Sequence, residues 1–174
     1  FYKITNKMIW SGNLTLSENK IIRHTEFIDN WDTWGQVELD YEDTDLAFSP
    51  NIIWASIFNY QLNDKFNIDV ISKYVGEQFI DNTSSKDRML NDYLVNHLRL
   101  SYNWKNKIFK TTKITMQINN LFDTEYVSNA WVYRFISENW DPRSSDPYVN
   151  KDSQRGYNMA GYFPQAKRNY LLGV

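Results

Sequence analysis

The residues best suited to bind a ligand are gathered in one polar stretch near the end of the chain, residues 124–167. Aromatic and guanidinium side chains recur there at short intervals, at Trp131, Tyr133, Arg134, Trp140, Arg143, Tyr148, Arg155, Tyr157 and Tyr162. Such groups suit a planar, anionic or sugar-like ligand, because rings stack and guanidinium groups donate paired hydrogen bonds. The alternative is that these residues pack the loop onto itself or form an interfacial aromatic girdle. We take the first eight as candidate ligand-binding residues.

The other polar clusters in the sequence do not indicate a metal or catalytic site. The acidic run at residues 40–45 could ligate a hard cation through carboxylate oxygens, but it lacks the glycine of an EF-hand loop. A solvated rim is the simpler interpretation, for this run and for Asp141, Asp146 and Asp152. His24 and His97 are the only histidines, and there is no nucleophile elbow and no metal-ligand spacing. We therefore predict no catalytic residue, metal or cofactor, and no enzyme.

Composition restricts the class of protein. The chain has 174 residues, 10 Phe, 7 Trp and 12 Tyr, yet its mean hydropathy is −0.61. Aromatic-rich but polar chains arise when a sheet has one apolar and one wet face, and also in carbohydrate-binding β-domains. The net charge of −2 argues against nucleic-acid binding. The chain contains no cysteine, no apolar signal segment and no run approaching the ~18 to 20 apolar residues of a spanning helix. Any membrane role must therefore belong to strands.

Six stretches alternate between apolar and polar residues with a period of two, which is typical of strands with chemically different faces. They are residues 10–16, 52–61, 66–75, 94–104, 114–119 and 169–174. In the fourth stretch, for example, Leu98, Leu100 and Tyr102 alternate with the wet residues Arg99 and Ser101. In 52–61 and 66–75 both registers carry apolar residues, so the outward face of these two is less clearly defined.

The connections between these stretches alternate in length. Residues 62–65 and 103–107 predict tight polar turns, whereas residues 30–50, 79–89 and 124–167 predict long polar loops. Every proline lies in or at the edge of a long segment, where no ladder N–H is required. Short turns on one rim and long loops on the other are typical of a transmembrane β-barrel.

Two motifs carry a family resemblance. Residues 118–126 read INNLFDTEY, and after an aromatic loop residues 164–170 read PQAKRNY and open a last strand. This order closely resembles the C-terminal end of TonB-dependent outer-membrane receptors. Residues 10–17, 47–51 and 72–83 also resemble stretches of such receptors from Bacteroidetes-type bacteria.

The resemblance implies an all-β fold, an antiparallel transmembrane β-barrel segment that supplies about the last six strands of a 22-stranded barrel. Residues 1–174 would then be the C-terminal part of the receptor β-barrel in a Gram-negative outer membrane, with the plug domain and TonB box absent from this chain. The long loops would be extracellular, and the turns and residues 1–7 periplasmic. His97 and Arg99 would point into the barrel interior, and Asn119 and Asn120 would bond to the backbone where the strand bends.

The resemblance also implies a function, active import of a scarce nutrient. Its partners would be the TonB complex, the rest of the barrel and plug, outer-membrane lipid and a small-molecule nutrient such as a ferric siderophore, haem, cobalamin or a glycan. We favour a metal chelate or cobalamin. Two alternatives stay open at this point, a soluble all-β carbohydrate-binding module and an outer-membrane barrel that belongs to a larger assembly and does not transport.

Overall fold

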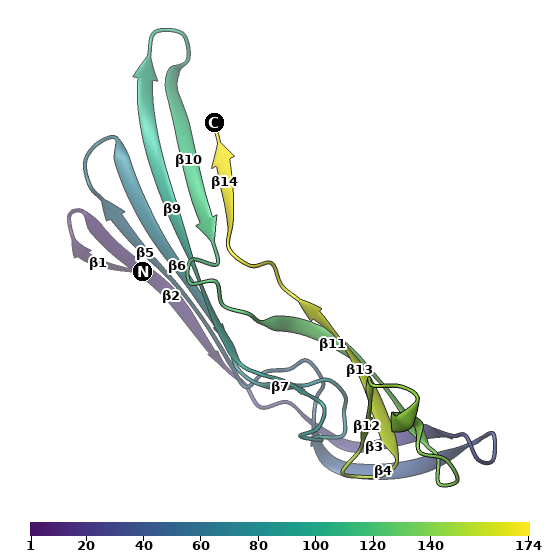
Figure 1. Ribbon diagram of the computed structural model, residues 1–174. Coiled ribbons are helices and arrows are strands. Elements are labelled where there is room, and N and C mark those ends of the chain that lie inside the picture. The colour runs from purple at the N-terminus through teal and green to yellow at the C-terminus, as the bar shows by residue number, and fades with distance from the viewer.

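The computed structural model describes residues 1–174 apart from the side chain of residue 106, and it consists of two large β-sheets joined end to end (Figure 1). The strands in chain order are β1 (Tyr2–Thr5), β2 (Met8–Leu16), β3 (Lys20–Asn30), β4 (Gly35–Asp45), β5 (Ile52–Gln61), β6 (Phe66–Val75), β7 (Gln78–Phe79), β8 (Met89–Leu90), β9 (Tyr93–Asn106), β10 (Lys110–Asn119), β11 (Val127–Ile136), β12 (Val149–Lys151), β13 (Tyr157–Pro164) and β14 (Asn169–Gly173). One 3-10 turn, η1 (Pro142–Ser144), precedes β12. Among the described residues, no helix has the length and apolar character needed to cross a membrane. The predicted all-β class is confirmed.

The first sheet contains seven antiparallel strands in the order β1-β2-β5-β6-β9-β10-β14. All six predicted strands lie in it, and β5 and β6 have the predicted bounds. β1 is a seventh strand, which escaped prediction because four residues are too few to display a period. β9 continues to residue 106, so the turn predicted at 103–107 lies at 107–109, beyond the last paired residues of β9 and β10.

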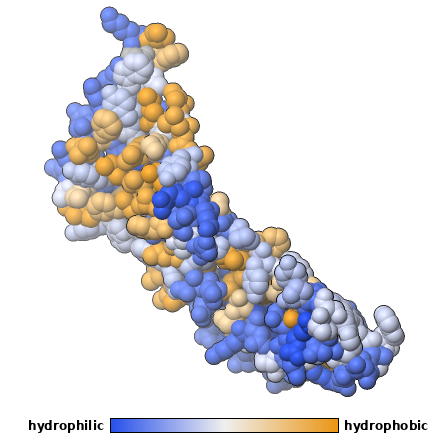
Figure 2. All heavy atoms as spheres, viewed as in Figure 1, coloured by the Kyte–Doolittle hydropathy of each residue, from blue (hydrophilic) through white to orange (hydrophobic). Residues whose placement is uncertain are grey.

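The strand register places the predicted apolar residues on one face of this sheet. Directly opposed residues share a face, and two complete rows cross six strands: Met8, Tyr60, Ile68, Leu100, Met116 and Leu172, then Trp10, Phe58, Val70, Leu98, Ile118 and Tyr170. Among the described residues no second sheet packs on these rows, so Leu172 is 75% exposed and Leu14, on the same face, 60%. Figure 2 shows apolar side chains gathered over this sheet and hydrophilic ones over the other. An extended apolar face of this kind is what a barrel wall turns toward lipid.

The opposite face of the sheet is bridged by polar side chains. Arg99 Nε donates to Gln117 Oε1 (3.0 Å), and Asn119 Nδ2 donates to Asn169 Oδ1 (2.8 Å). His97 shares this face, as the pairing of alternate residues requires. The prediction that His97 and Arg99 lie on the wet side of the sheet is therefore confirmed.

The second sheet contains five strands in the order β12-β13-β11-β3-β4. It occupies residues 20–45 and most of 127–164, so the prediction that 30–50 and 124–167 are loops is wrong for their secondary structure. In β4, Val37, Leu39 and Tyr41 do alternate with acidic residues. So many carboxylates in one segment disfavour a strand. Partners on the neighbouring strand β3 accommodate them; for example, Thr25 Oγ1 donates to Asp40 (2.6 Å).

A bend at Asn120 separates β10 from the second sheet. Asn120 has a positive φ of 50°, which Asn tolerates better than most residues, and it is buried. Its Nδ2 donates to the carbonyls of Thr124 (2.8 Å) and Ala166 (3.3 Å), and its Oδ1 accepts from the Thr124 N–H (2.9 Å). One side chain thus joins the outgoing chain to the returning chain. The predicted structural role of this asparagine is confirmed.

Candidate functional site

A cleft opens in the second sheet where β3 and β11 diverge. The two strands are paired, in parallel, only at Phe135 opposite Asp29 and Ile136 opposite Asn30. The space beyond that contact forms a cleft of about 680 Å³, lined by both strands and by residues 80–82. Its walls include exposed apolar rings and carboxylates that come from separate parts of the chain.

Three of the sequence-predicted residues line this cleft: Trp131, Tyr133 and Arg134. The Trp131 indole lies across Gly161 on β13, where an added Cβ would come within 2.2 Å of the indole nitrogen. Trp131 is nevertheless 47% exposed, so its other face is available for stacking. Tyr133 Oη donates to Asp29 Oδ2 (2.9 Å), which fixes its ring against β3.

Beside the cleft, Arg88 forms the centre of a buried ion cluster. Its side chain is completely buried. Its Nε donates to Asp81 (2.5 Å), its Nη2 to Thr83 Oγ1 (2.5 Å) and Gln154 Oε1 (2.8 Å), and its Nη1 to Asp152. These bonds attach the 79–91 segment to the chain between β12 and β13.

Arg134 extends the cluster to the β3–β4 hairpin. Its guanidinium bonds to Glu26 on β3, to Tyr41 Oη on β4 (3.2 Å), to Asp152 (3.3 Å) and to the Arg155 carbonyl (3.0 Å). Arg134 is buried, and its Nε has no hydrogen-bond partner. The sequence predicts that Arg134 binds a ligand, whereas in the structure its charge is paired with two carboxylates, those of Glu26 and Asp152.

Charge pairing favours the ionised forms of Asp152 and Arg88 against the effect of burial. Burial by itself would raise the pKa of Asp152, but hydrogen bonds from Asn158, the Gln154 N–H and Arg88 outweigh it and hold that pKa below 3.8. Burial likewise opposes the charge of Arg88, yet Asp81 and Asp152 raise its pKa above its ordinary value. Three segments distant in the sequence are therefore held together by complementary charges.

The two other predicted arginines, and one tyrosine, lie on the surface outside this cleft. Arg143 pairs with Asp141 (2.6 Å), and its hydrogen bonds lower the pKa of that carboxyl to about 2. Arg155 lies 3.7 Å from Glu138. Tyr148 is 73% exposed. Both guanidinium groups thus face a carboxylate of the protein itself.

The remaining predicted aromatics, Tyr157 and Trp140, belong to a stack of rings that connects the β3–β4 hairpin with β11 and β13. Tyr157 is buried, with its ring 5.6 Å from that of Phe135. Phe135 in turn stacks on Trp31 at 3.9 Å and 12°, and Trp31 lies 6.3 Å from the half-exposed Trp140. Tyr157 therefore has a packing position, whereas Trp140 forms the outer end of the stack.

Sequence reasoning missed the tip of the β3–β4 hairpin. Trp31 and Trp34 lie there beside a shallow hollow of about 600 Å³, which is also lined by Asp29, Asn30 and Gln36. The signal was present in the sequence WDTWG, since two tryptophans within a polar turn are unusual in a solvated loop. The prediction of a long loop at 30–50 hides this signal, because the two tryptophans matter only once β3 and β4 form a hairpin.

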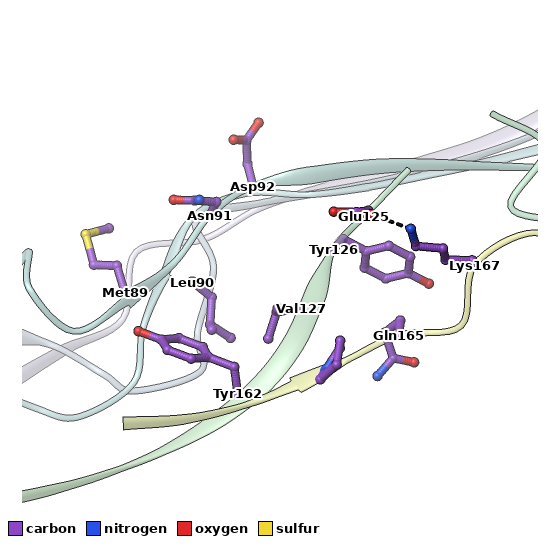
Figure 3. Close-up of a pocket in the computed structure, with 11 residues that line it drawn as sticks. Met89, Leu90, Asn91, Asp92, Glu125, Tyr126, Val127, Tyr162, Gln165 and Lys167 are labelled. Atoms are coloured by element: carbon purple, nitrogen blue, oxygen red, sulfur yellow. Dashed lines mark ion pairs between the residues drawn. The ribbon is translucent and has the colours of Figure 1, made fainter. Parts of the chain in front are cut away.

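A second cleft of about 550 Å³ lies at the waist between the sheets (Figure 3). Tyr162, the ninth residue of the sequence-level set, lines it beside Leu90 and Val127. The ion pair of Lys167 with Glu125 (2.5 Å) closes its other end. The cleft lies where β11 contacts β8, and a second tyrosine, Tyr126, also lines it.

Nothing in the described residues forms a metal site, because no group of three or more His, Cys, Asp or Glu side chains is suitably placed. The acidic run at 40–45 lies in β4, where successive side chains alternate between faces. Three of its carboxylates are bonded to neighbouring groups: Asp40 to Thr25, Glu42 to Arg23 and Asp45 to Lys20.

Comparison with known proteins reveals a structural likeness without a sequence match. No protein-family model and no curated protein matches the sequence. The ferric-catecholate import receptor Fiu from E. coli K12 aligns over 97% of this chain in both of its forms, with TM-scores of 0.52 (closed, 18% identity) and 0.51 (open, 16% identity). The copper transporter OprC aligns over 99% at 13% identity, with a TM-score of 0.47 that is too low to carry an argument.

The likeness extends over nearly the whole of this chain but only part of the other proteins. The aligned region is 18% of Fiu and 22% of OprC, so the chain spans about a fifth of their length. At such low identity the comparison shows the fold alone. The chain is a segment of an antiparallel β-barrel of the kind that Fiu contains.

Proposed function

We propose that this chain is the C-terminal barrel segment of a TonB-dependent outer-membrane receptor, which imports a scarce nutrient across the outer membrane of a Gram-negative cell. The observation that carries the proposal is the sheet with one exposed apolar face and one polar face, combined with its alignment to Fiu over 97% of the chain. The receptor motifs at 118–126 and 164–170 support it independently. The Bacteroidetes-type source is proposed only from the resemblance of residues 10–17, 47–51 and 72–83.

In this proposal the second sheet projects from the outer surface of the cell and contributes to ligand capture. Trp131 and Tyr133 present rings to the cleft between β3 and β11, and Trp140 and Tyr148 present theirs to solvent. Arg134 and Tyr157 hold the loops in place through buried ion pairs and ring stacking, whereas Arg143 and Arg155 form surface pairs with Asp141 and Glu138. Loops carried on a rigid scaffold are the usual position of binding residues.

The rest of the machine would come from outside these 174 residues. A plug within the barrel and a contact with the TonB complex would couple transport to proton-motive force, and the nutrient would cross without any covalent step. The polar face that carries Arg99 and Gln117 would then line the interior beside the plug. A ferric siderophore, haem, cobalamin or another scarce nutrient would be the cargo, and this chain would act as no enzyme.

A soluble carbohydrate-binding module accounts less well for the same observations. Such a module buries its apolar faces between two packed sheets. Here the two apolar rows of the first sheet are uncovered. The buried clusters lie elsewhere: Ile80 and Leu90 of the β7–β8 segment pack on Ala130 of β11, and Phe135, Val149 and Tyr157 cluster within the second sheet. In water, a chain with this face uncovered would aggregate.

The test is uptake by the intact organism. Deleting the gene for the full-length receptor should abolish growth on one limiting nutrient, and inactivating TonB should reproduce the defect. Complementation with the wild-type gene provides the control. If growth and uptake are unchanged for every nutrient tested, the transport proposal fails and a barrel that does not transport is favoured. A monodisperse, soluble monomer made from residues 1–174 in water would overturn the membrane assignment itself.

A further inference from the structure

The guanidinium groups of the extracellular sheet are matched by the protein's own carboxylates. Arg134 is bonded to Glu26 and Asp152, and Arg88 to Asp81 and Asp152. Arg143 and Arg155 have their own acidic partners, Asp141 and Glu138. An anionic ligand would have to displace a carboxylate from one of these pairs. At the tip of the β3–β4 hairpin, the groups available to a ligand are aromatic faces, amides and carboxylate oxygens.

Trp34, at the tip of the β3–β4 hairpin, has no role in folding that the structure reveals. Its side chain is 92% exposed, and its backbone has a positive φ of 60°. That conformation favours glycine or asparagine and costs a bulky residue about 1 kcal/mol or more. An exposed indole in this position adds no burial to compensate. A residue that is unfavourable on both counts indicates a function outside the fold.

In contrast to Trp34, the neighbouring Trp31 is held in place by contacts with other residues. Its ring stacks on buried Phe135 at 3.9 Å, and its Nε1 donates to Tyr133 Oη (3.2 Å). Asp32 fastens the tip to the opposite loop by accepting from the backbone N–H groups of Glu138 (2.6 Å) and Asn139 (3.2 Å). The hollow therefore has one fixed aromatic wall and one exposed aromatic wall.

Polar groups suited to hydroxyls line the same hollow. Asp29 accepts from Gln36 Nε2 (2.9 Å) and from Tyr133 Oη (2.9 Å), and these bonds lower its pKa. It is the only ionisable side chain among the residues that line the hollow, all of them described by the structure. Gln36 and Asn30 add amide groups, which both donate and accept. Because Asp29 already holds two donors, it is better placed to accept from a hydroxyl than to act as a free counter-ion.

We infer that the hollow between Trp31 and Trp34 binds a neutral sugar ring. The apolar C–H face of a pyranose would lie against an indole, and its hydroxyls would bond to Asp29, Asn30 and Gln36. The inference rests on the proposed function for the exposure of this tip at the cell surface. Asp29 and Gln36 line both the hollow and the cleft between β3 and β11, so a glycan bound at the tip reaches the cleft that contains Trp131.

The experiment measures binding of the full-length receptor, in detergent micelles, to an immobilised panel of neutral, sialylated and amino-sugar oligosaccharides. The receptor should bind at least one neutral oligosaccharide, and Trp34→Gly should weaken that binding roughly tenfold or more, since one stacking face is lost. Thermal stability should not fall, because glycine relieves the positive φ. Trp104→Phe, which alters an exposed tryptophan of the other sheet, is the matched control and should bind like the wild type.

Several outcomes would overturn the inference. They are the absence of binding to any neutral oligosaccharide, binding confined to sialylated or amino sugars or to the host's own lipopolysaccharide, and a Trp34→Gly variant that binds like the wild type. Failure here is separable from failure of the transport proposal. TonB-dependent uptake without neutral-sugar binding refutes only the sugar site, and sugar binding without any uptake refutes only transport.

Discussion

Replacing Arg88 tests whether the buried ion cluster holds the second sheet and the 79–91 segment together. The substitution Arg88→Met keeps an unbranched apolar stem but removes four side-chain contacts, with Asp81, Asp152, Thr83 and Gln154. Asp152, whose side chain has no exposed surface, then loses one of its two cationic partners. A carboxylate with a single cationic partner, Arg134, then remains in a site closed to water.

The magnitude follows from burial. Removing one partner of a buried ion pair costs about 3 to 5 kcal/mol, because the remaining charge stays desolvated. The exposed pair of Arg23 and Glu42, with side chains 74% and 71% exposed, provides the contrast. Such pairs contribute about 0 to 1 kcal/mol. Two arginine substitutions in the same sheet should thus differ several-fold in their effect.

Hydrogen exchange of the full-length receptor measures the difference. For Arg88→Met, amides in residues 149–158 should exchange faster by about two to three orders of magnitude, because each 1.4 kcal/mol of lost local stability is tenfold. Arg23→Met should change exchange by less than about fivefold. The double variant Arg88→Met/Asp152→Asn should recover part of the loss, since it removes the stranded charge. If exchange in residues 149–158 is unchanged in Arg88→Met, or if Arg23→Met has the same effect, the cluster does not stabilise this region and the reasoning is refuted.

Three further results are expected. Asn120→Ala should lower the unfolding temperature of the barrel by several degrees, because it removes three hydrogen bonds and a residue that tolerates a φ of 50°. The measurement is the temperature at which heat-modifiable migration on gels is lost, and an unchanged temperature would contradict the role of the bend. Met116→Arg should impair assembly into the outer membrane, because a charge on the lipid face costs about 2 to 4 kcal/mol. Thr115→Arg, on the opposite face, should be tolerated. Equal assembly of the two variants would refute the assignment of faces. The pKa of Asp152 is lowered in the folded state, so its stabilisation is complete above pH 3.8 and is lost as pH falls through the folded pKa. Pepsin should therefore cleave residues 149–158 faster as pH falls below 3.8, and Asp152→Asn should flatten that dependence.

How far the sequence predicts the fold can be judged from particular elements. Period-two alternation predicts six of the seven strands of the first sheet and, outside 52–61 and 66–75, the face that each residue occupies, because alternation is a local property of extended backbone. The bend at Asn120 is predicted for a similar reason, since asparagine is disfavoured within a strand and bonds readily to nearby backbone. The same prediction is wrong for Asn119, whose side chain bonds to the side chains of Gln117 and Asn169 within the sheet. β4 was missed although it alternates, because its carboxylates outweighed the pattern until the β3 strand supplied their partners.

The candidate site depends on contacts between residues far apart in the sequence, which local patterns do not predict. The sequence nominated aromatic and guanidinium groups together, and only the structure separates them into paired arginines and exposed rings. Arg134 meets Glu26 across 108 residues of chain, and Trp31 meets Tyr133 across 102. Such contacts depend on how far β3 and β11 bend toward each other, which neither strand encodes alone.

The sequence by itself determined a sheet with an apolar and a polar face, the hairpins that build it and the motifs that resemble those of receptor barrels, since each arises from residues near one another in the chain. Only the tertiary structure decided that β3 and β11 meet at two residues and then diverge, that the arginines of the loops are already matched by carboxylates, and that Trp31 and Trp34 share a hollow. Those features come from packing between distant hairpins, where burial and charge pairing are properties of the assembled sheet.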